Sequence, residues 1–590
     1  MLMLNFSSVV NLNHPQVYLH WSFISISVAN LIIIATMIVI FGLAIMLPFP
    51  KTKQIFYNEE KENYNEPPLP ANSNDTHMLT HKLRRLGLKY LPPKKLLPDR
   101  QPSYVASWIY VFGVATLAAL FMVIVSGMIL VIGGVSWWHE SSVGHFFNSI
   151  HLWGVELFMA FMVIHLWGKF WMAAWRGKRA LTWMTGVLAF AVSILEAFTG
   201  YLSQQNFDSQ WIATNGKDAI NATGLGSFFN LMNFGQMIGW HIVLIPLALV
   251  LVVALHVVLV RVRGVSHPIQ KARGQAAKRA LKAAEASEWR GPNRRYDIIK
   301  EGIIATAIVL LLVLGLAAIL SSPDDPPVTI ATWSKLAPAD FLATAASELN
   351  GTSKTATYGP PYNNASGSVQ RLGMSWQMIA GVHSKINSAQ TFVLSPLTKF
   401  SPSDAKLASA LKTYDQASSG QQLAWADAYA NVVSKVKFVN NQPVVPKAKD
   451  GPVPLMLSTE LNMARSGAID ADLLAQQPFY GTNYTKPLLF IEDGNYFSSL
   501  AQKQHLTGSQ WGVMNETGSY PGQPWLWLYT LWYQIPGFSR SANVDLIAIY
   551  LTGLATLLLL SVPFIPGLRD IPKVIPIHKL IWRQYYKNKQ

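Results

Sequence analysis

Four histidines lie inside apolar stretches long enough to cross a membrane, where an ionisable side chain is costly and marks a candidate functional site. His151 and His165 are 14 residues apart, and His241 and His256 are 15 apart. At about 100° per residue, each pair lies roughly on one helix face, about 21–22 Å apart along the axis. Two parallel helices with such pairs can hold two haems, each between one imidazole from either helix. We therefore predict that His151 and His241 bind an outer haem iron and that His165 and His256 bind an inner one. The alternative is that each histidine only forms hydrogen bonds between helices.

Glycines repeat this spacing in two other apolar stretches. Gly113 and Gly127 are 14 residues apart, as are Gly186 and Gly200. A helix without side chains at these points allows the edge of a macrocycle to approach closely, so all four glycines are predicted to bind the haems. Helix packing through small residues is the alternative.

The composition favours a protein that crosses the membrane several times. Only 13% of the 590 residues are charged and 51% are hydrophobic, whereas soluble proteins carry roughly 25% charged residues. The absence of cysteine excludes disulfides, thiolate metal sites, cysteine-ligated iron–sulfur clusters and covalent c-type haem. Seven stretches reach the required length of about 20 residues. They are Ser22–Leu47, Ala106–Val135, Phe146–Ala173, Leu181–Leu202, Phe234–Val260, Ile298–Leu320 and Val544–Pro563.

The charge of the connecting loops predicts their side of the membrane. Residues 261–300 carry eleven Lys/Arg and three Asp/Glu, whereas residues 204–232 carry one Lys and two Asp. By the positive-inside rule, we expect a multi-pass cell-membrane protein with the N-terminus and residues 321–543 outside and a cytoplasmic C-terminus. The basic stretch 271–295 then faces lipid headgroups, so we predict a membrane-lipid partner and no nucleic acid.

The predicted fold is an all-α polytopic membrane protein with a haem-binding helical bundle and a large, mostly helical extracellular insertion between the last two spans. The expected segments are an outer N-terminal segment (1–21), an extra transmembrane helix (22–48), a basic cytoplasmic loop (49–102), a four-helix dihaem core (103–263), a second basic loop (264–297), a transmembrane helix (298–320), the extracellular domain (321–543), the last helix (544–565) and a basic tail (566–590).

Glycosylation motifs give a partial check of this orientation. Six sequons fall on the side assigned as outer and are predicted to be glycosylated, although chance occurrence is the alternative. They begin at Asn5, Asn221, Asn350, Asn364, Asn483 and Asn515.

The histidine pairs and nearby motifs resemble the cytochrome b family of quinol-oxidising bc-type complexes. Besides both pairs, the similarity includes Trp183-x-x-Gly186-Val187, the run 197–201 (Ala-Phe-Thr-Gly-Tyr) and Gly264-Val265-Ser266-x-Pro268. The extra first span, the long outer region and the absence of cysteine look most like the cytochrome b-like subunits of archaeal terminal-oxidase assemblies.

The resemblance implies a subunit of a quinol-oxidising respiratory enzyme that moves electrons between two haems, of b type or with a-type haem in place of b. It also implies an outer quinol-oxidation site, for which the run 338–342 (Pro-Ala-Asp-Phe-Leu) offers Asp340; the alternative is an ordinary helix start. Glu196, near the outer end of its span, could accept a proton from quinol, or could be a polar group held between helices. Bifurcated oxidation requires a Rieske iron–sulfur protein, and haem–copper oxidase subunits are further expected partners.

Two departures from the family pattern affect the outer site. Asn148 stands where the family usually has an arginine, so the outer haem propionate needs another partner. Ser203-Gln204-Gln205 replaces the family's Leu-Pro-Trp. Two other functions stay open: a dihaem electron conduit of a dehydrogenase or reductase without a bifurcating quinol site, and a non-enzymatic membrane-anchored surface glycoprotein with structural histidines.

Overall fold

A computed structural model describes most of the chain. The described residues are 9–15, 17–50, 87, 93–270, 274–433, 436–439, 442–444, 450–475, 482–507, 518–522 and 527–588.

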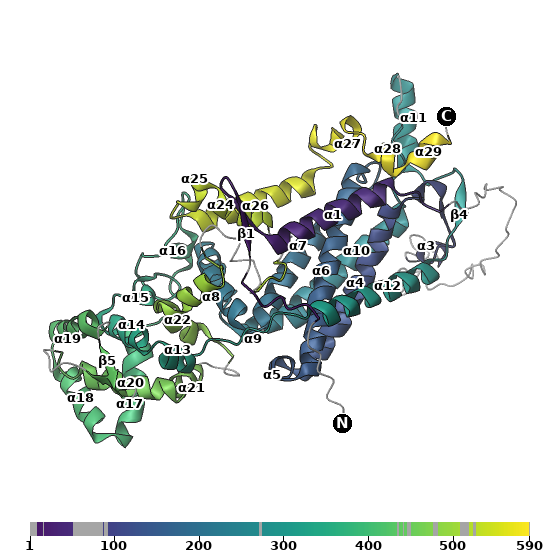
Figure 1. Cartoon of the computed structure of the whole chain (residues 1–590). Helices are drawn as coiled ribbons and strands as arrows, with labels where there is room; N and C mark the ends of the chain where they lie inside the picture. The colour runs from purple at the N-terminus through teal and green to yellow at the C-terminus, as the bar shows by residue number, and fades with distance from the viewer. Residues whose placement is uncertain are drawn as a thin grey trace, which may run out of the picture.

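Seven helical segments of the described chain are long and apolar enough to cross a membrane, which confirms the predicted mostly helical, multi-span fold class. They contain α1 (Val28–Met46), α4 (Val111–Gly133), α6 (Ser142–Trp171), α7 (Ala180–Ser203), the continuous segment α9–η4–α10 (Phe234–Gly239, Trp240–Leu244 and Ile245–Arg263), α12 (Ile298–Leu320) and α26 (Val544–Ser561). In Figure 1 these helices form one bundle.

Local sequence signals set the ends of several of these helices. Ser27, Ser141 and Asp297 precede α1, α6 and α12, and each side chain accepts a hydrogen bond from a backbone N–H in the first turn. Such caps satisfy donors that have no partner inside the helix. α4 and α10 end at Gly134 and Gly264, whose φ angles of 79° and 67° suit glycine.

The bundle is built from two helix pairs. α4 packs against α6, and α7 packs against α10. α12 covers α4 and α6, α26 lies beside α7, and α1 contacts α6 from outside. Trp153, Met159 and Val313 are buried where α4, α6 and α12 meet. The two pairs therefore present α6 and α10, the histidine-bearing helices, within one bundle.

The connecting segments gather at opposite ends of the bundle (Figure 1). One end carries α11 (Gln275–Ala286), α27 (Ile571–Val574), α28 (His578–Ile581) and α29 (Arg583–Lys587), and the other carries α5 (Val135–Glu140) and α8 (Phe207–Ala222). Three two-stranded antiparallel sheets complete the described connections: β1 (Tyr18–Trp21) with β2 (Ile24–Ser27), β3 (Arg100–Pro102) with β4 (Asn293–Arg295), and β5 (Lys437–Val439) with β6 (Gln442–Val444). The end with α11 and α27–α29 carries the basic loops of the sequence, and the end with α5 and α8 carries loops that are not basic.

The region after α12 is mostly helical, as predicted. Its helices are α13 (Ile330–Leu336), α14 (Pro338–Asn350), α15 (Lys354–Thr357), α16 (Trp376–Ala380), η5 (Ala389–Leu394), α17 (Ser395–Phe400), α18 (Ala405–Gln416), α19 (Ser419–Val433), α20 (Val453–Arg465), α21 (Ala468–Ala475), α22 (Thr485–Asp493), α23 (Tyr496–Lys503), α24 (Trp527–Gln534) and α25 (Pro536–Ser539). Asp404 caps α18, and its side chain accepts hydrogen bonds from the backbone N–H groups of Lys406 and Leu407.

This region shares one hydrophobic core with the loop between α7 and α9. Phe207 and Trp211 of α8 belong to the same buried cluster as Trp333, Phe341 and Phe490. The boundary expected at residue 321 therefore does not separate two independent cores, although the expected segment limits remain predictions.

Two carboxyl groups are buried side by side inside this region. Glu348 is completely buried and accepts a hydrogen bond of 2.6 Å from Ser353 Oγ. Burial, together with the neighbouring Asp493 carboxyl, raises the pKa of Glu348 well above its usual value. Burial also raises the pKa of Asp493. The folded state therefore favours protonated carboxyl groups here.

Candidate functional site

One half of the site lies between α4 and α6. Gly127 of α4 faces His151 of α6, and Gly113 faces His165. A Cβ atom on Gly127 would lie 3.1 Å from His151 Cε1, and one on Gly113 would lie 2.9 Å from His165 Cε1. Both approaches are closer than ordinary van der Waals contact, so the imidazoles occupy space that only glycine leaves open.

The other half lies between α7 and α10 and follows the same plan. A Cβ atom on Gly200 would lie 2.5 Å from His241 Cε1, and one on Gly186 would lie 3.0 Å from His256 Cε1. Each of the four predicted glycines thus faces a different one of the four predicted histidines. Gly127 and Gly200 face the histidines predicted to bind the outer haem, and Gly113 and Gly186 face those predicted to bind the inner one.

His241 lies in a π-helical turn, η4, which joins α9 to α10. Pro246 is the second residue after this turn. Proline has no backbone N–H to donate within an α-helix, and its ring clashes with the carbonyl group of the preceding turn. A π-turn accommodates about one extra residue. The 15-residue spacing from His241 to His256 therefore becomes nearly equivalent to the 14-residue spacing on α6.

The two halves face each other across the bundle. The ring centroids of His151 and His241 are 6.2 Å apart, and their planes are perpendicular. Two imidazoles that each bind one metal at about 2 Å have centroids roughly 6 Å apart, so this pair is spaced for a shared iron. His165 and His256 lie 14 and 15 residues further along the same two helical segments.

The hydrogen bonds of three histidines leave Nε2 as the ligating atom. Ser126 Oγ donates to Met122 O, so it accepts from His151 Nδ1 at 3.0 Å. Thr185 Oγ1 likewise lies 3.1 Å from His256 Nδ1. A proton held on Nδ1 leaves the Nε2 lone pair for a metal.

Glu196 performs this role for His241. The Nδ1 atom of His241 lies 3.1 Å from Glu196 Oε1 and 3.1 Å from the Glu196 carbonyl oxygen. Both oxygens accept, so His241 is held in the same tautomer as His151. The structure therefore brings Glu196 to a predicted haem ligand. The proton-accepting role expected from the sequence stays a prediction.

The fit of haem to these residues rests on the donors and on the space. Four neutral imidazoles in two opposed pairs are the usual axial ligands of electron-transfer haem. The glycines face the imidazoles, so the helices can approach a macrocycle at both levels. His151 with His241 and Gly127 with Gly200 would hold the outer haem, and His165 with His256 and Gly113 with Gly186 the inner one.

Asp340 lies outside this site, in the first turn of α14. Its carboxylate accepts hydrogen bonds from Trp333 Nε1 at 2.8 Å and from the backbone N–H groups of Asn495 and Tyr496 at 3.0 and 2.9 Å. These bonds hold the first turn of α23 against α13 and favour the structural alternative. The predicted quinol-site role of Asp340 stays untested.

Two residues that depart from the family pattern, Asn148 and Gln204, contact each other. Gln204 Nε2 donates to Asn148 Oδ1 at 3.0 Å. His139, which no sequence pattern singled out, lies 2.7 Å through Nε2 from the Gln204 carbonyl oxygen. These groups lie at the end of α6 nearest His151.

The described sequon asparagines differ in accessibility. Asn364 is exposed, whereas Asn221 is 5% exposed and donates to the Tyr358 hydroxyl at 2.9 Å. A glycan on Asn221 is incompatible with this buried bond, which counts against that prediction. Asn350 and Asn483 are partly buried, and Asn5 and Asn515 lie outside the described residues.

Sequence reasoning missed two of the residues that hold the imidazoles. Ser126 directly precedes Gly127, and Thr185 directly precedes Gly186. A hydroxyl residue before a haem-facing glycine is thus a signal that could have found them.

Comparisons with known proteins match the same helices. The family model described as cytochrome b (N-terminal)/b6/petB matches residues 156–327. The cytochrome b subunit of the cytochrome bc complex of Chlorobaculum thiosulfatiphilum is 29% identical over 140 residues, 22% of this chain and 33% of the relative. The menaquinol:cytochrome c reductase cytochrome b subunit of Bacillus subtilis (strain 168) is 25% identical over 189 residues, 28% of this chain and 84% of the relative.

The chain thus spans about a third of the first relative and most of the second. A chain of a hyperthermophilic respiratory Complex III aligns with 66% of this chain and 95% of its own length at 16% identity, with a TM-score of 0.30, too low to support an argument. The expected resemblance to the cytochrome b family is confirmed for the helices that carry three of the four histidines.

Proposed function

From the cytochrome b-type segment in this chain, we propose that the protein is the dihaem cytochrome b-like subunit of a bc-type respiratory complex. It would oxidise quinol at the outer membrane face and move electrons across the membrane between two bis-histidine haems. Bound haems, of b type or with a-type haem in place of b, would supply the one-electron chemistry. The chain fixes their ligands, their separation and the polarity around them.

The opposed His151–His241 pair is the observation that carries this proposal. Its 6.2 Å centroid distance, the Nδ1 contacts to Ser126 and Glu196, and the facing Gly200 all favour a shared iron. Interhelical hydrogen bonding alone would explain the Nδ1 contacts. It would not explain why a glycine faces every one of the four imidazoles.

Catalysis in this proposal needs partner subunits. The chain has no cysteine, so a Rieske iron–sulfur protein must supply the iron–sulfur centre, and haem–copper oxidase subunits are further proposed partners. We also propose that the N-terminus and residues 321–543 are outside the cell and that the C-terminus is cytoplasmic, because the basic loops gather at the other end of the bundle.

A visible spectrum of the purified protein, with pyridine haemochrome analysis, tests the proposal. The expected result is a Soret band, an α band in the reduced state and two haems per chain, with the pyridine adduct identifying the porphyrin. A protein without these bands would instead be the surface glycoprotein considered from the sequence.

Inhibition of turnover by quinol analogues distinguishes the proposed function from a dihaem conduit without a bifurcating quinol site. Quinol analogues that act at the outer face should block turnover of the intact complex if quinol is oxidised there. Turnover that is insensitive to every such analogue, in a protein with both haems, would favour the conduit.

A further inference from the structure

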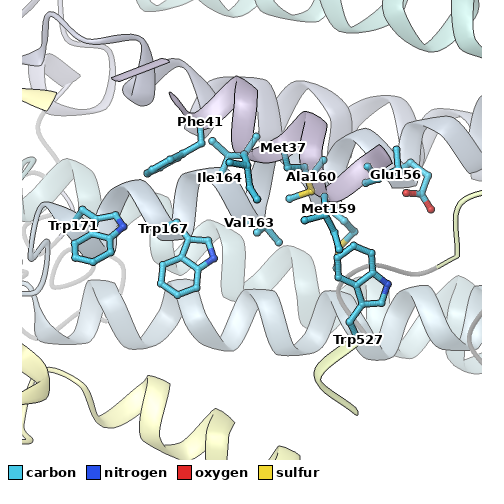
Figure 2. A pocket seen from close by; sticks show the side chains of 13 residues that line it. Met37, Phe41, Glu156, Met159, Ala160, Val163, Ile164, Trp167, Trp171 and Trp527 are labelled. Carbon is cyan, nitrogen blue, oxygen red and sulfur yellow. The ribbon is translucent and has the colours of Figure 1, made fainter. Parts of the chain in front are cut away.

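A cavity of about 420 Å³ lies between α1 and α6, on the side of the bundle away from the haem-binding site. Its walls are almost entirely hydrocarbon and aromatic: Met37, Phe41, Met159, Val163, Trp167 and Trp171 line it (Figure 2). The volume is that of a small-molecule site. Trp167 is 50% and Ile38 65% exposed, so the rim opens sideways to the membrane interior.

One acidic group lines this apolar cavity. Glu156 is 6% exposed, and its Oε1 atom is buried without a hydrogen-bond partner among the described residues. Figure 2 shows the carboxyl group at one end of the cavity, on the side of Trp527, with Trp167 and Trp171 toward the other end. A buried polar atom without a partner is unfavourable. A ligand that forms a hydrogen bond with the Glu156 carboxyl would remove this cost.

Helix geometry separates Glu156 from the haem ligands. It follows His151 by five residues and precedes His165 by nine, which places it about 140° and 180° around α6 from them. Glu156 therefore faces away from both histidines and lies at a depth between them. It has no place in the haem-binding arrangement.

The shape of the cavity limits the occupant. α1 and α6 contact each other, so a further helix, about 10 Å wide, does not fit between them. A lipid acyl chain fits the walls but offers nothing to Glu156. A flat ring can lie beside Met159 and Trp527, where a hydroxyl or carbonyl group reaches the Glu156 carboxyl. A hydrocarbon tail can then run along the cavity toward Trp167 and leave through the rim.

We propose that the α1–α6 cavity binds a lipid-soluble quinone or quinol, with its ring oxygen hydrogen-bonded to Glu156. This site is additional to the quinol oxidation proposed above and does not depend on it. It also gives the extra first helix a function, since α1 forms one wall of the cavity.

Photoaffinity labelling of the purified protein tests this site. A short-tailed azidoquinone is photolysed with the wild type, E156Q, E156L and the exposed-carboxylate control E140Q, and labelled peptides are mapped by mass spectrometry. Labelling is expected within residues 33–41 and 156–171, and a decyl-tailed benzoquinone should compete. E156L should require about tenfold more probe, while E156Q, which keeps a hydrogen-bonding group, and E140Q should stay close to wild type.

Haem content is measured on the same samples, so that failure of this site and failure of the haem proposal are distinguishable. Labelling of these peptides supports the inference even in a haem-free preparation. A protein with normal haem content that is not labelled here, or whose labelling is unchanged in E156L, would overturn it. A photoreactive phospholipid that labels these peptides and is not displaced by excess quinone would overturn it as well.

Discussion

Alanine at Gly200 should remove the outer haem, because the structure leaves no space for a side chain there. The new Cβ would lie 2.5 Å from His241 Cε1, whereas ordinary contact begins at 3.4 Å. The imidazole must retreat by about 0.9 Å, and metal–ligand distances tolerate roughly 0.2 Å. At Gly127 the corresponding distance is 3.1 Å, so a retreat of about 0.3 Å suffices, which is close to that tolerance and far smaller than the retreat required at Gly200.

Helix propensity acts in the opposite direction and allows the two effects to be separated. Alanine stabilises a helix interior by about 0.5–1 kcal/mol relative to glycine. Overpacking a well-filled contact costs about 1–3 kcal/mol. Loss of haem from the variant would therefore come from the displaced imidazole and not from a weakened α7.

The assay is the haem-to-protein ratio from pyridine haemochrome analysis, combined with a redox titration of the α band. G200A should fall from two haems per chain to about one, and G127A should keep both with a shifted outer potential. Gly315 of α12 has no atom of the described residues within 4 Å of its hypothetical Cβ, so G315A is the matched control and should be unchanged. Two intact haems in G200A, or greater damage in G127A than in G200A, would refute the reasoning.

Three further predictions concern carboxyl groups. E196L should raise the outer haem potential, by about 60 mV for each tenfold change in iron preference, because the side-chain oxygen beside His241 Nδ1 is lost; a redox titration with both potentials unchanged would contradict this. Glu348 keeps its proton to higher pH in the folded protein than in the unfolded chain, so the free energy of unfolding should fall as pH rises above about 4.3. E348Q should flatten that slope in thermal unfolding scans, and an equal slope in both proteins would exclude Glu348 as the source. D340A should lower stability by about 2 kcal/mol through lost bonds to α23 without changing the haem spectrum; lost quinol turnover at unchanged stability would instead support the quinol-site prediction.

The parts of the fold that depend on periodicity could be predicted from the sequence. A run of about 20 apolar residues dictates a membrane helix, and the 14-residue step puts His151 above His165 on any α-helix. The matched glycine step predicts where these helices can be approached closely, and in the structure an imidazole faces each of the four glycines. These features are local to single helices, so no knowledge of tertiary contacts is needed.

The parts that depend on long-range contacts could not be predicted. Asp340 has the sequence context of an ordinary first-turn helix residue, and its role appears only when Asn495 and Tyr496 arrive from 155 and 156 residues away. The π-turn at His241 results from a local break at Pro246. Its consequence, the alignment of His241 with His151 on the other helix pair, depends on how the helices pack. Asn221 carries a motif for modification, yet its burial depends on packing against Tyr358.

The most direct test of the central claim is an experimental density map of the purified protein that resolves the bundle interior. We expect two haems about 20 Å apart along the helices, one iron bound by Nε2 of His151 and His241 and the other by Nε2 of His165 and His256. Density that is empty between these imidazoles, or irons bound by other side chains, would contradict the account.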